Sequence, residues 1–242
     1  DQYGDTYKAN GIGLETIQRF ERILIKSSDL LDLVYGEAGE TPVSDADLTS
    51  HLQNEMVELA YYTIPLYNTS TYAFADDDQK AEMLSLAQAA VDGYNSDIPA
   101  DANSQFTTFN TAASNALSGI YAVLDSTVPS DSTTSLQTEL LSSSTIDSAF
   151  TIDGSADTIR GLSYGEAAAV QYSSLSMMMA VRLDPLAANT LSTVRAQVLS
   201  DMKSDELQDA LAAYGASMEH SLNSSAMGKL PAKKIVVNSS NS

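Results

Sequence analysis

Residues 164–183 read YGEAAAVQYSSLSMMMAVRL, an apolar run that stops at Asp184-Pro185. We expect this run to form one long helix that ends there, because the ring of proline cannot continue a helix. Three consecutive residues, Met177, Met178 and Met179, point in three directions around a helix, so this helix is apolar most of the way round. The run predicts a central helix that is buried inside the monomer or covered by a partner subunit.

The rest of the chain also shows helical periodicity. Apolar residues recur every three to four positions, which is typical of amphipathic helices, and Ser44 and Asp76 precede two such segments as N-caps. We expect helices over residues 14–34, 44–62, 76–93, 103–124, 136–141, 164–183, 191–202 and 204–218. The sequence thus predicts an all-α fold, an irregular bundle of six to eight helices with a Ser/Thr-rich excursion and an extended C-terminal arm.

The domain organisation follows from composition. We expect an N-terminal helical region over residues 1–125, and a Ser/Thr-rich linker or surface excursion over 126–160. Residues 161–228 then form a C-terminal helical region that packs on the first, so that both belong to one domain. Residues 229–242 are a tail that carries a local basic cluster of Lys229, Lys233 and Lys234.

The charge is strongly acidic. The 242 residues include 32 Asp and Glu against 12 Lys and Arg, for a formal net charge of −20. From Ala81 to Ile159 there is no Lys, Arg or His, although ten acidic residues occur there. Polyanions are bound through Lys and Arg clusters, so this surface excludes nucleic acid and an acidic membrane leaflet as partners. The longest charge-free run in an apolar segment, Ala167 to Val181, is shorter than the ~20 residues that a transmembrane helix needs.

The chain has no cysteine, which excludes disulfides, thiolate catalysis and cysteine-ligated zinc. It begins at Asp1, so we expect that a signal segment has been removed or that the chain was trimmed. A composition rich in Ser, Thr, Asp, Asn and Tyr and poor in Lys favours an extracellular or cell-envelope location. Three sequons, at Asn68, Asn223 and Asn238, are about as many as chance provides.

A possible metal site lies on the helix expected over residues 44–62. Four side chains fall within roughly an 80° arc of that helix: Asp47, His51, Glu55 and Glu58. A histidine between carboxylates could bind a divalent cation, whereas the alternative is a solvated helix side beside the apolar stripe.

Two acidic loops could also hold calcium. The first loop contains Asp92, Asn95, Asp97 and Asp101, and the second contains Asp147, Asp153 and Asp157.

Aromatic residues gather in one stretch of the chain. There are twelve Tyr, five Phe and no Trp, and the densest group surrounds Pro65: Tyr61, Tyr62, Tyr67, Tyr72 and Phe74. Such rings either form an interaction surface or fill a core while the hydroxyl stays in water. A second possible interaction element is Ile235-Val236-Val237 in the tail, which could add a strand to a neighbour or be a frayed end.

One short motif matches a catalytic pattern. Residues 161–165, Gly-Leu-Ser-Tyr-Gly, fit the G-x-S-x-G nucleophile elbow, with Ser163 as nucleophile and His220 downstream as base. The alternative is a capping box, in which Ser163 and Glu166 open the helix that follows. The capping box explains the same residues without the β-strands that a hydrolase of this class requires.

Three functions follow from these patterns. The leading hypothesis is a non-enzymatic, exported structural or interaction subunit of a surface, matrix or particle assembly, which binds a protein partner or copies of itself. The second is a helical binding protein for a small ligand or a divalent cation. The third is a serine hydrolase that uses Ser163 and His220.

Overall fold

The structure is a computed structural model that describes residue 18 and residues 29–129 and 135–217. The chain divides into two compact units, residues 1–202 and 203–242. The elements are α3 (Asp45–Asn54), β1 (Met56–Pro65), α4 (Asp77–Asn95), α5 (Ala102–Ala122), β2 (Gln137–Ser142), α6 (Ser143–Ala149), α7 (Ser155–Gly161), β3 (Ala167–Gln171), β4 (Ser176–Leu183), α8 (Pro185–Ala188) and α9 (Leu191–Ser217). Residues 29–35 are also helical.

The first unit is built around a four-stranded sheet, so the all-α prediction is wrong and the fold is mixed α/β. The strand order is β2-β1-β4-β3, and every neighbouring pair is antiparallel. β1 occupies an inner position, where Leu59 lies opposite Glu139 of β2 and Arg182 of β4. The two edge strands are therefore β2 and β3.

The predicted long helix over residues 164–183 is instead the β3–β4 hairpin. Met177 and Met179 pack into the cluster on one face of the sheet, whereas Met178 packs into the cluster on the other face. A strand that is buried on both faces is apolar at every position, and this makes its sequence look like a helix that is apolar all round. All three methionines are buried, which explains the run without a central helix.

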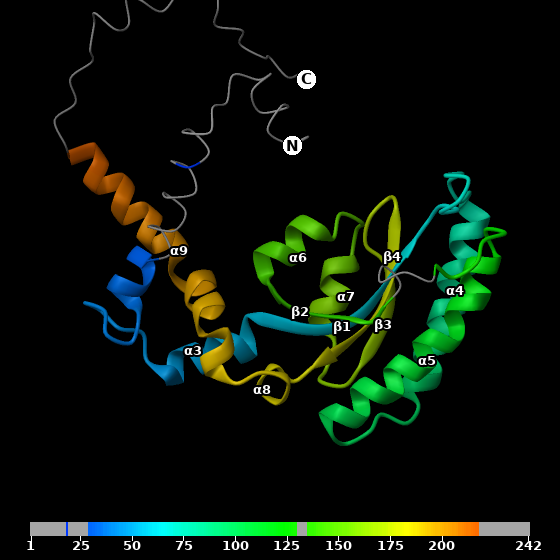
Figure 1. Cartoon of the computed structure of the whole chain (residues 1–242), viewed down its shortest axis with the longest axis horizontal. Coiled ribbons are helices and arrows are strands. Elements are labelled where there is room, and N and C mark those ends of the chain that lie inside the picture. Colours follow the sequence, from blue (N-terminus) through cyan, green and yellow to red (C-terminus); the bar gives the residue numbers. More distant parts are fainter. Residues whose placement is uncertain (1–17, 19–28, 130–134, 218–242) are drawn as a thin grey trace, which may run out of the picture. The chain divides into compact units, whose positions relative to one another are not determined.

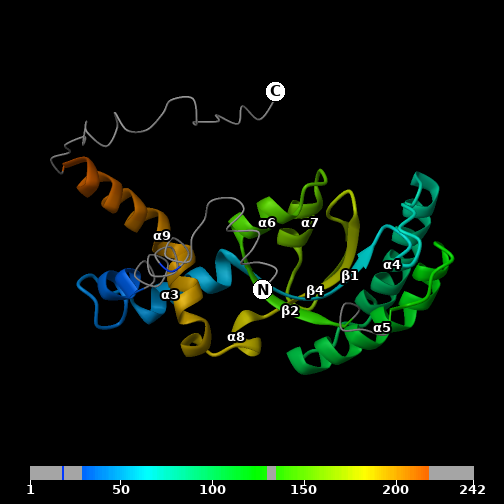
Figure 2. The same ribbon diagram turned by 45° about the horizontal axis from the view of Figure 1, so that its top comes forward.

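One face of the sheet is covered by α4 and α5. Figure 1 shows this pair on the side of the sheet opposite α6 and α7, and Figure 2 shows the same arrangement. α4 packs against β3, and α5 packs against β4. The largest fully buried side chain in this layer, Phe109, meets the ring of Tyr94 edge to face, with centroids 5.6 Å apart. As predicted, Asp76 caps α4, and its side chain accepts from the backbone of Gln79.

The other face is covered by α6 and α7, which carry the chain from one edge strand to the other. Ile146 of α6 and Ile159 of α7 are completely buried against this face. The Ser/Thr-rich residues 126–160 thus include β2 and both helices of this layer. The segment 136–141, predicted to be helical, lies in the edge strand β2.

The predicted helix over residues 44–62 divides in two. Ser44 caps α3 as expected, but α3 ends at Asn54, with Glu55 as its C-cap. β1 follows directly, and its Val, Leu, Tyr, Thr and Ile residues favour a strand.

In the second unit, Lys203 and Glu206 form an ion pair along α9. Among the described residues, no helix combines the length and apolarity needed to cross a bilayer.

Candidate interaction surface

Three aromatic residues form a cluster in the loop between β1 and α4. Tyr67 lies almost parallel to Tyr72, with centroids 6.4 Å apart, and meets Phe74 edge to face at 6.1 Å. A backbone bridge joins Tyr67 to Phe74. Tyr72 and Phe74 are 73% and 69% exposed. We call Tyr67, Tyr72 and Phe74 the aromatic tip; among the described residues, Tyr72 and Phe74 are the most exposed large hydrophobic side chains.

Asn68 holds the loop of the aromatic tip in shape. Its side-chain oxygen accepts hydrogen bonds from the backbone N–H groups of Ser70 and Thr71, at 2.9 and 3.0 Å. Its amide nitrogen donates to the carbonyl oxygen of Leu124 at 2.8 Å, and the residue is only 8% exposed. Asn68 therefore serves the fold, and the nitrogen that a glycan would need is already used.

The backbone of the aromatic tip is strained at one residue. Tyr72 has a φ of +58°, in the left-handed region that costs a non-glycine residue free energy. Its N–H donates to the Asn68 carbonyl oxygen, while the Asn68 N–H donates to the Ala73 carbonyl oxygen, both at 2.8 Å. These bonds hold the loop closed, so the backbone that carries the exposed rings has a defined conformation before any partner binds.

The surroundings of the aromatic tip are acidic and partly apolar. Leu66, the residue before Tyr67, donates its N–H to the carbonyl oxygen of Leu175, which is 48% exposed in the turn between β3 and β4. On the other side, Asp76, Asp77 and Asp78 begin α4 directly after the tip. Asp77 pairs with Lys80, but at 99% exposure its carboxylate stays in water.

The predicted tyrosine surface is divided by the structure. Tyr67 and Tyr72 are brought together, whereas Tyr62 is buried and donates its hydroxyl to Asn110 at 2.6 Å. Tyr61 is half-buried and donates to Glu139 at 2.8 Å. Burial, and then the neighbouring Glu139 carboxylate, raise the pKa of the Tyr61 hydroxyl. Ile235, Val236 and Val237 lie outside the described residues.

The four predicted metal ligands do not share one helix face. Asp47 and His51 lie on α3, Glu55 follows its end, and Glu58 lies on β1. The Nε2 atom of His51 is 2.8 Å from Oδ2 of Asp201 on α9, so its partner is a carboxylate that the sequence analysis did not select. Asp47, His51, Glu55 and Met202 line a shallow hollow of about 230 Å³. The described part of the chain contains no group of three or more His, Asp or Glu placed to hold a metal ion.

Glu58 is a buried carboxylic acid inside the fold. It is 4% exposed, and its Oε2 accepts a hydrogen bond of 3.1 Å from the side chain of Asn189. Burial raises the pKa of this carboxyl, the bond from Asn189 opposes that rise, and Glu139 adds to it. Glu58 therefore links β1 to the end of α8 and contributes to stability in a pH-dependent way.

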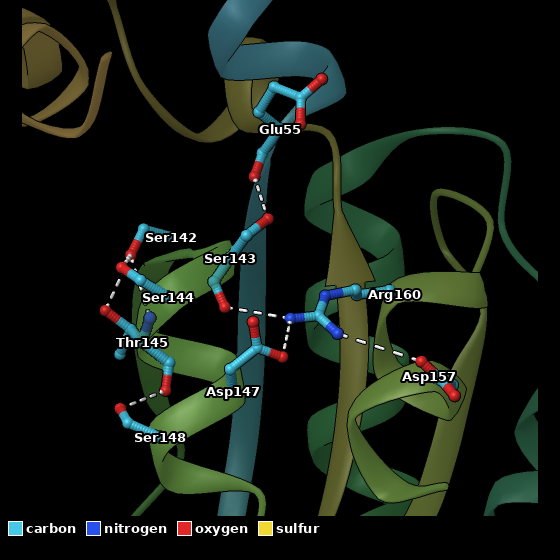
Figure 3. A network of polar contacts seen from close by, with 9 residues as sticks. All are labelled: Glu55, Ser142, Ser143, Ser144, Thr145, Asp147, Ser148, Asp157 and Arg160. Atoms are coloured by element: carbon cyan, nitrogen blue, oxygen red, sulfur yellow. Dashed lines mark hydrogen bonds and ion pairs between the residues drawn. The ribbon is translucent and has the colours of Figure 1, made fainter. Parts of the chain in front are cut away.

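The acids of one predicted calcium loop bind an arginine. Arg160 of α7 forms ion pairs with Asp147 of α6 and with Asp157, and it donates to the carbonyl oxygen of Ser143 at 3.0 Å (Figure 3). The hydroxyl of Ser143 in turn donates to the carbonyl oxygen of Glu55 (Figure 3). This network fastens α6 and α7 to the start of β1.

The other predicted calcium loop is used for capping and edge protection. Asp101 caps α5 by accepting from Ser104, and these hydrogen bonds lower the pKa of its carboxyl. The side chain of Asn95 both donates to and accepts from the backbone of Ala167, at 2.8 and 2.9 Å. It thereby occupies both backbone groups of Ala167, the first residue of the edge strand β3, which an approaching strand would otherwise use.

Ser163 does not lie in a nucleophile elbow. It follows α7 and precedes β3, whereas the elbow requires a strand before the serine and a helix after it. The capping-box prediction is also wrong in part. The N–H of Ser163 donates to the Glu166 carboxylate at 2.9 Å, but the bond closes a turn before a strand. His220 lies outside the described residues.

A groove runs between α4 and α5 on the outer side of the helix pair. It measures about 510 Å³ and is lined by alanine, glycine, threonine, asparagine and one tyrosine: Ala89, Ala90, Gly93, Tyr94, Thr107, Thr108, Thr111, Ala112 and Asn115. No charged side chain is among the residues that line it.

The aromatic tip could be found only in part from the sequence. The aromatic density around Pro65 identified Tyr67, Tyr72 and Phe74, and the Asn-Thr-Ser sequence at residues 68–70 is a turn signal that could have identified Asn68. Leu175 gave no signal, because it comes near the tip only through the sheet. No protein-family model, curated protein or solved structure matches this chain.

Proposed function

We propose that this chain is a non-enzymatic interaction subunit of an extracellular or cell-envelope assembly, and that the aromatic tip is its contact surface. The observation that carries the proposal is the exposure of Tyr72 and Phe74, at 73% and 69%, on a loop that Asn68 holds in one conformation. Aromatic rings contribute much of the binding free energy at protein interfaces. A contact surface that is already ordered loses little conformational entropy on binding.

The partner that fits this surface combines an apolar patch with positive charge. The rings of the aromatic tip offer apolar area, and Asp76, Asp77 and Asp78 lie beside them. An acidic partner would be repelled by this group and by the net charge of −20. A protein surface with Lys or Arg around an apolar centre complements both features.

The composition supports the extracellular or cell-envelope location. Ser, Thr, Asp and Tyr are frequent, and only 12 of the 242 residues are Lys or Arg. Fractionation of the source cells checks this part of the proposal: we expect the protein in the envelope or the medium, and its recovery in the cytosol alone would contradict the location.

Sedimentation velocity and light scattering over a wide concentration range test the contact surface. The full chain is compared with the double variant Tyr72→Ser/Phe74→Ser. The matched control is Tyr214→Ser, which removes a tyrosine that is 66% exposed on α9. We expect the full chain and the control to form higher species, and we expect the double variant to need at least tenfold higher concentration to do so.

Two results would contradict the proposal. One is a full chain that stays monomeric at every concentration. The other is an association that the double variant leaves unchanged. Urea unfolding of the double variant shows that the result does not come from loss of the fold, because both side chains are exposed and their removal should alter stability little.

A further inference from the structure

The positive charges in the described part of the chain are already engaged. Lys80, Arg160, Arg195 and Lys203 pair with carboxylates. Arg182 donates to the carbonyl oxygens of Arg160 and Leu162 and lies over the ring of Tyr164, at 5.2 Å from its centroid. These five are all the Lys and Arg residues that the structure describes. A cation that complements the acids beside the aromatic tip must therefore come from elsewhere.

The C-terminal segment has the complementary chemistry. Residues 220–242 contain Lys229, Lys233 and Lys234 and no acidic residue. Ile235-Val236-Val237 follows the last two lysines directly, so positive charge and apolar side chains are adjacent. The other Lys and Arg residues outside the described part of the chain lie in residues 1–17 and 19–28, which contain as many acids as cations. The tail is thus the better match to an aromatic surface with an acidic rim.

We propose that residues 229–237 of one copy bind the aromatic tip of a second copy. This inference rests on the proposed function and names the partner of that same surface. Ile235, Val236 and Val237 bury the exposed rings of Tyr72 and Phe74, while Lys233 and Lys234 approach the carboxylates that begin α4. Opposite charges steer the encounter, and removal of the rings from water stabilises the complex.

The length of the chain permits such a contact between copies. The described part of α9 ends at Ser217. An extended chain spans roughly 3.3–3.6 Å per residue, so the residues from 218 to 234 can reach up to roughly 60 Å. Because the tail and the tip are different surfaces, two copies can exchange tails in a closed dimer, or successive copies can add to form rings or filaments.

Fluorescence anisotropy with a labelled peptide of residues 228–242 tests the inference. The receptor is the full chain with Lys233→Glu and Lys234→Glu, so that its own tail does not compete. We expect saturable binding that weakens at least tenfold when Tyr72→Ser and Phe74→Ser are added to the receptor. Binding should also weaken between 0.1 M and 0.5 M salt, because added salt screens the ion pairs. The matched receptor control carries Tyr214→Ser and should bind as before.

A control peptide with Lys233→Glu and Lys234→Glu should bind at least tenfold more weakly. The inference is overturned if the natural peptide fails to bind, or binds equally well when the tip is altered. The inference is also overturned if the natural full chain stays monomeric and does not bind the peptide, although the receptor with the altered tail does. The tail would then bind the aromatic tip of its own copy. A tip-dependent association without peptide binding would refute this inference alone and leave the proposed function standing. Peptide binding without a tip-dependent association would refute the proposed function.

Discussion

The side-chain nitrogen of Asn68 donates a hydrogen bond to the carbonyl oxygen of Leu124, 2.8 Å away, and so joins the aromatic tip to the turn that follows α5. The same residue holds the backbone of Ser70 and Thr71 through its side-chain oxygen. One buried amide therefore links the contact surface to the helix layer. The proposed contact depends on this link, because without it the rings would lose their fixed arrangement.

Replacement of Asn68 should destabilise the protein and the aromatic tip together. Asn68→Ala removes four side-chain hydrogen bonds and leaves a buried carbonyl oxygen without its donor, so we expect a loss of about 2–4 kcal/mol in the free energy of unfolding. Urea unfolding measures the loss. The matched control is Asn54→Ala, whose amide bonds only within α3 and is exposed, and this change should cost under about 1 kcal/mol. Equal losses in the two variants would contradict the role given to Asn68.

The folded protein should carry no glycan at Asn68. A glycan replaces a hydrogen on the same nitrogen that donates to Leu124, in a side chain that is almost fully buried. Peptide mass spectrometry of folded protein from a glycosylating host checks this. Occupancy of this sequon in protein with the native stability would show that the loop around Asn68 is arranged differently.

Glu58 should make the stability of the protein depend on pH. Burial raises the folded pKa of its carboxyl above the ordinary value of 4.5. The contribution of this group to stability is therefore present in full below pH 4.5 and is lost as the pH rises through the folded pKa. Glu58→Gln stays neutral and can still accept a hydrogen bond from Asn189. The variant should therefore become more stable than the natural chain as the pH rises through the folded pKa of Glu58.

Thermal unfolding from pH 4 to pH 8 measures the effect of Glu58→Gln. We expect the Tm difference between variant and natural chain to grow with pH, and a gain of about 1 kcal/mol corresponds to roughly 2–4 °C for a domain of this size. Glu82→Gln is the control, because Glu82 is an exposed carboxylate on α4. A difference that is constant with pH would contradict the burial of Glu58.

Gly119 should be replaceable with a gain in stability. It lies within α5, and a Cβ added there would meet no heavy atom within 4 Å. Gly119→Ala should therefore stabilise the helix by about 0.5–1 kcal/mol, measured by urea unfolding. Gly165→Ala should do the opposite, because Gly165 has a φ of +82° and its Cβ would lie 2.6 Å from the side-chain nitrogen of Gln105. A loss of stability at position 119 would mean that the outer side of α5 is covered.

The helices of the α4–α5 layer were predictable because their signals are local. Asp76 caps α4 as expected, and one face of each helix carries the apolar stripe. The cap of α5 is Asp101, which the sequence analysis had assigned to a possible calcium loop. α4 and α5 were expected within a few residues of where they lie. Ser44 marked the start of α3 in the same way, by accepting from the backbone of Asp47.

The β3–β4 hairpin was missed because these two strands are buried on both faces. The alternation that marks a half-buried strand disappears when both faces are apolar, as at Met177, Met178 and Met179. β1 was hidden for another reason: it follows α3 after one residue, so its apolar positions seemed to continue the helix. The expected arrangement of the four metal ligands on one helix was lost with that helix, because Glu58 lies on β1 and His51 on α3. Metal binding itself stays a prediction.

Photo-crosslinking from the aromatic tip tests the central claim most directly. The full chain with benzoylphenylalanine in place of Phe74 is mixed with the ¹⁵N-labelled natural chain, irradiated, and digested for mass spectrometry. The account predicts crosslinks that join position 74 of one copy to residues 229–237 of an isotopically distinct copy. Crosslinks that form only within one copy, or that reach other surfaces of an associated copy, would contradict it.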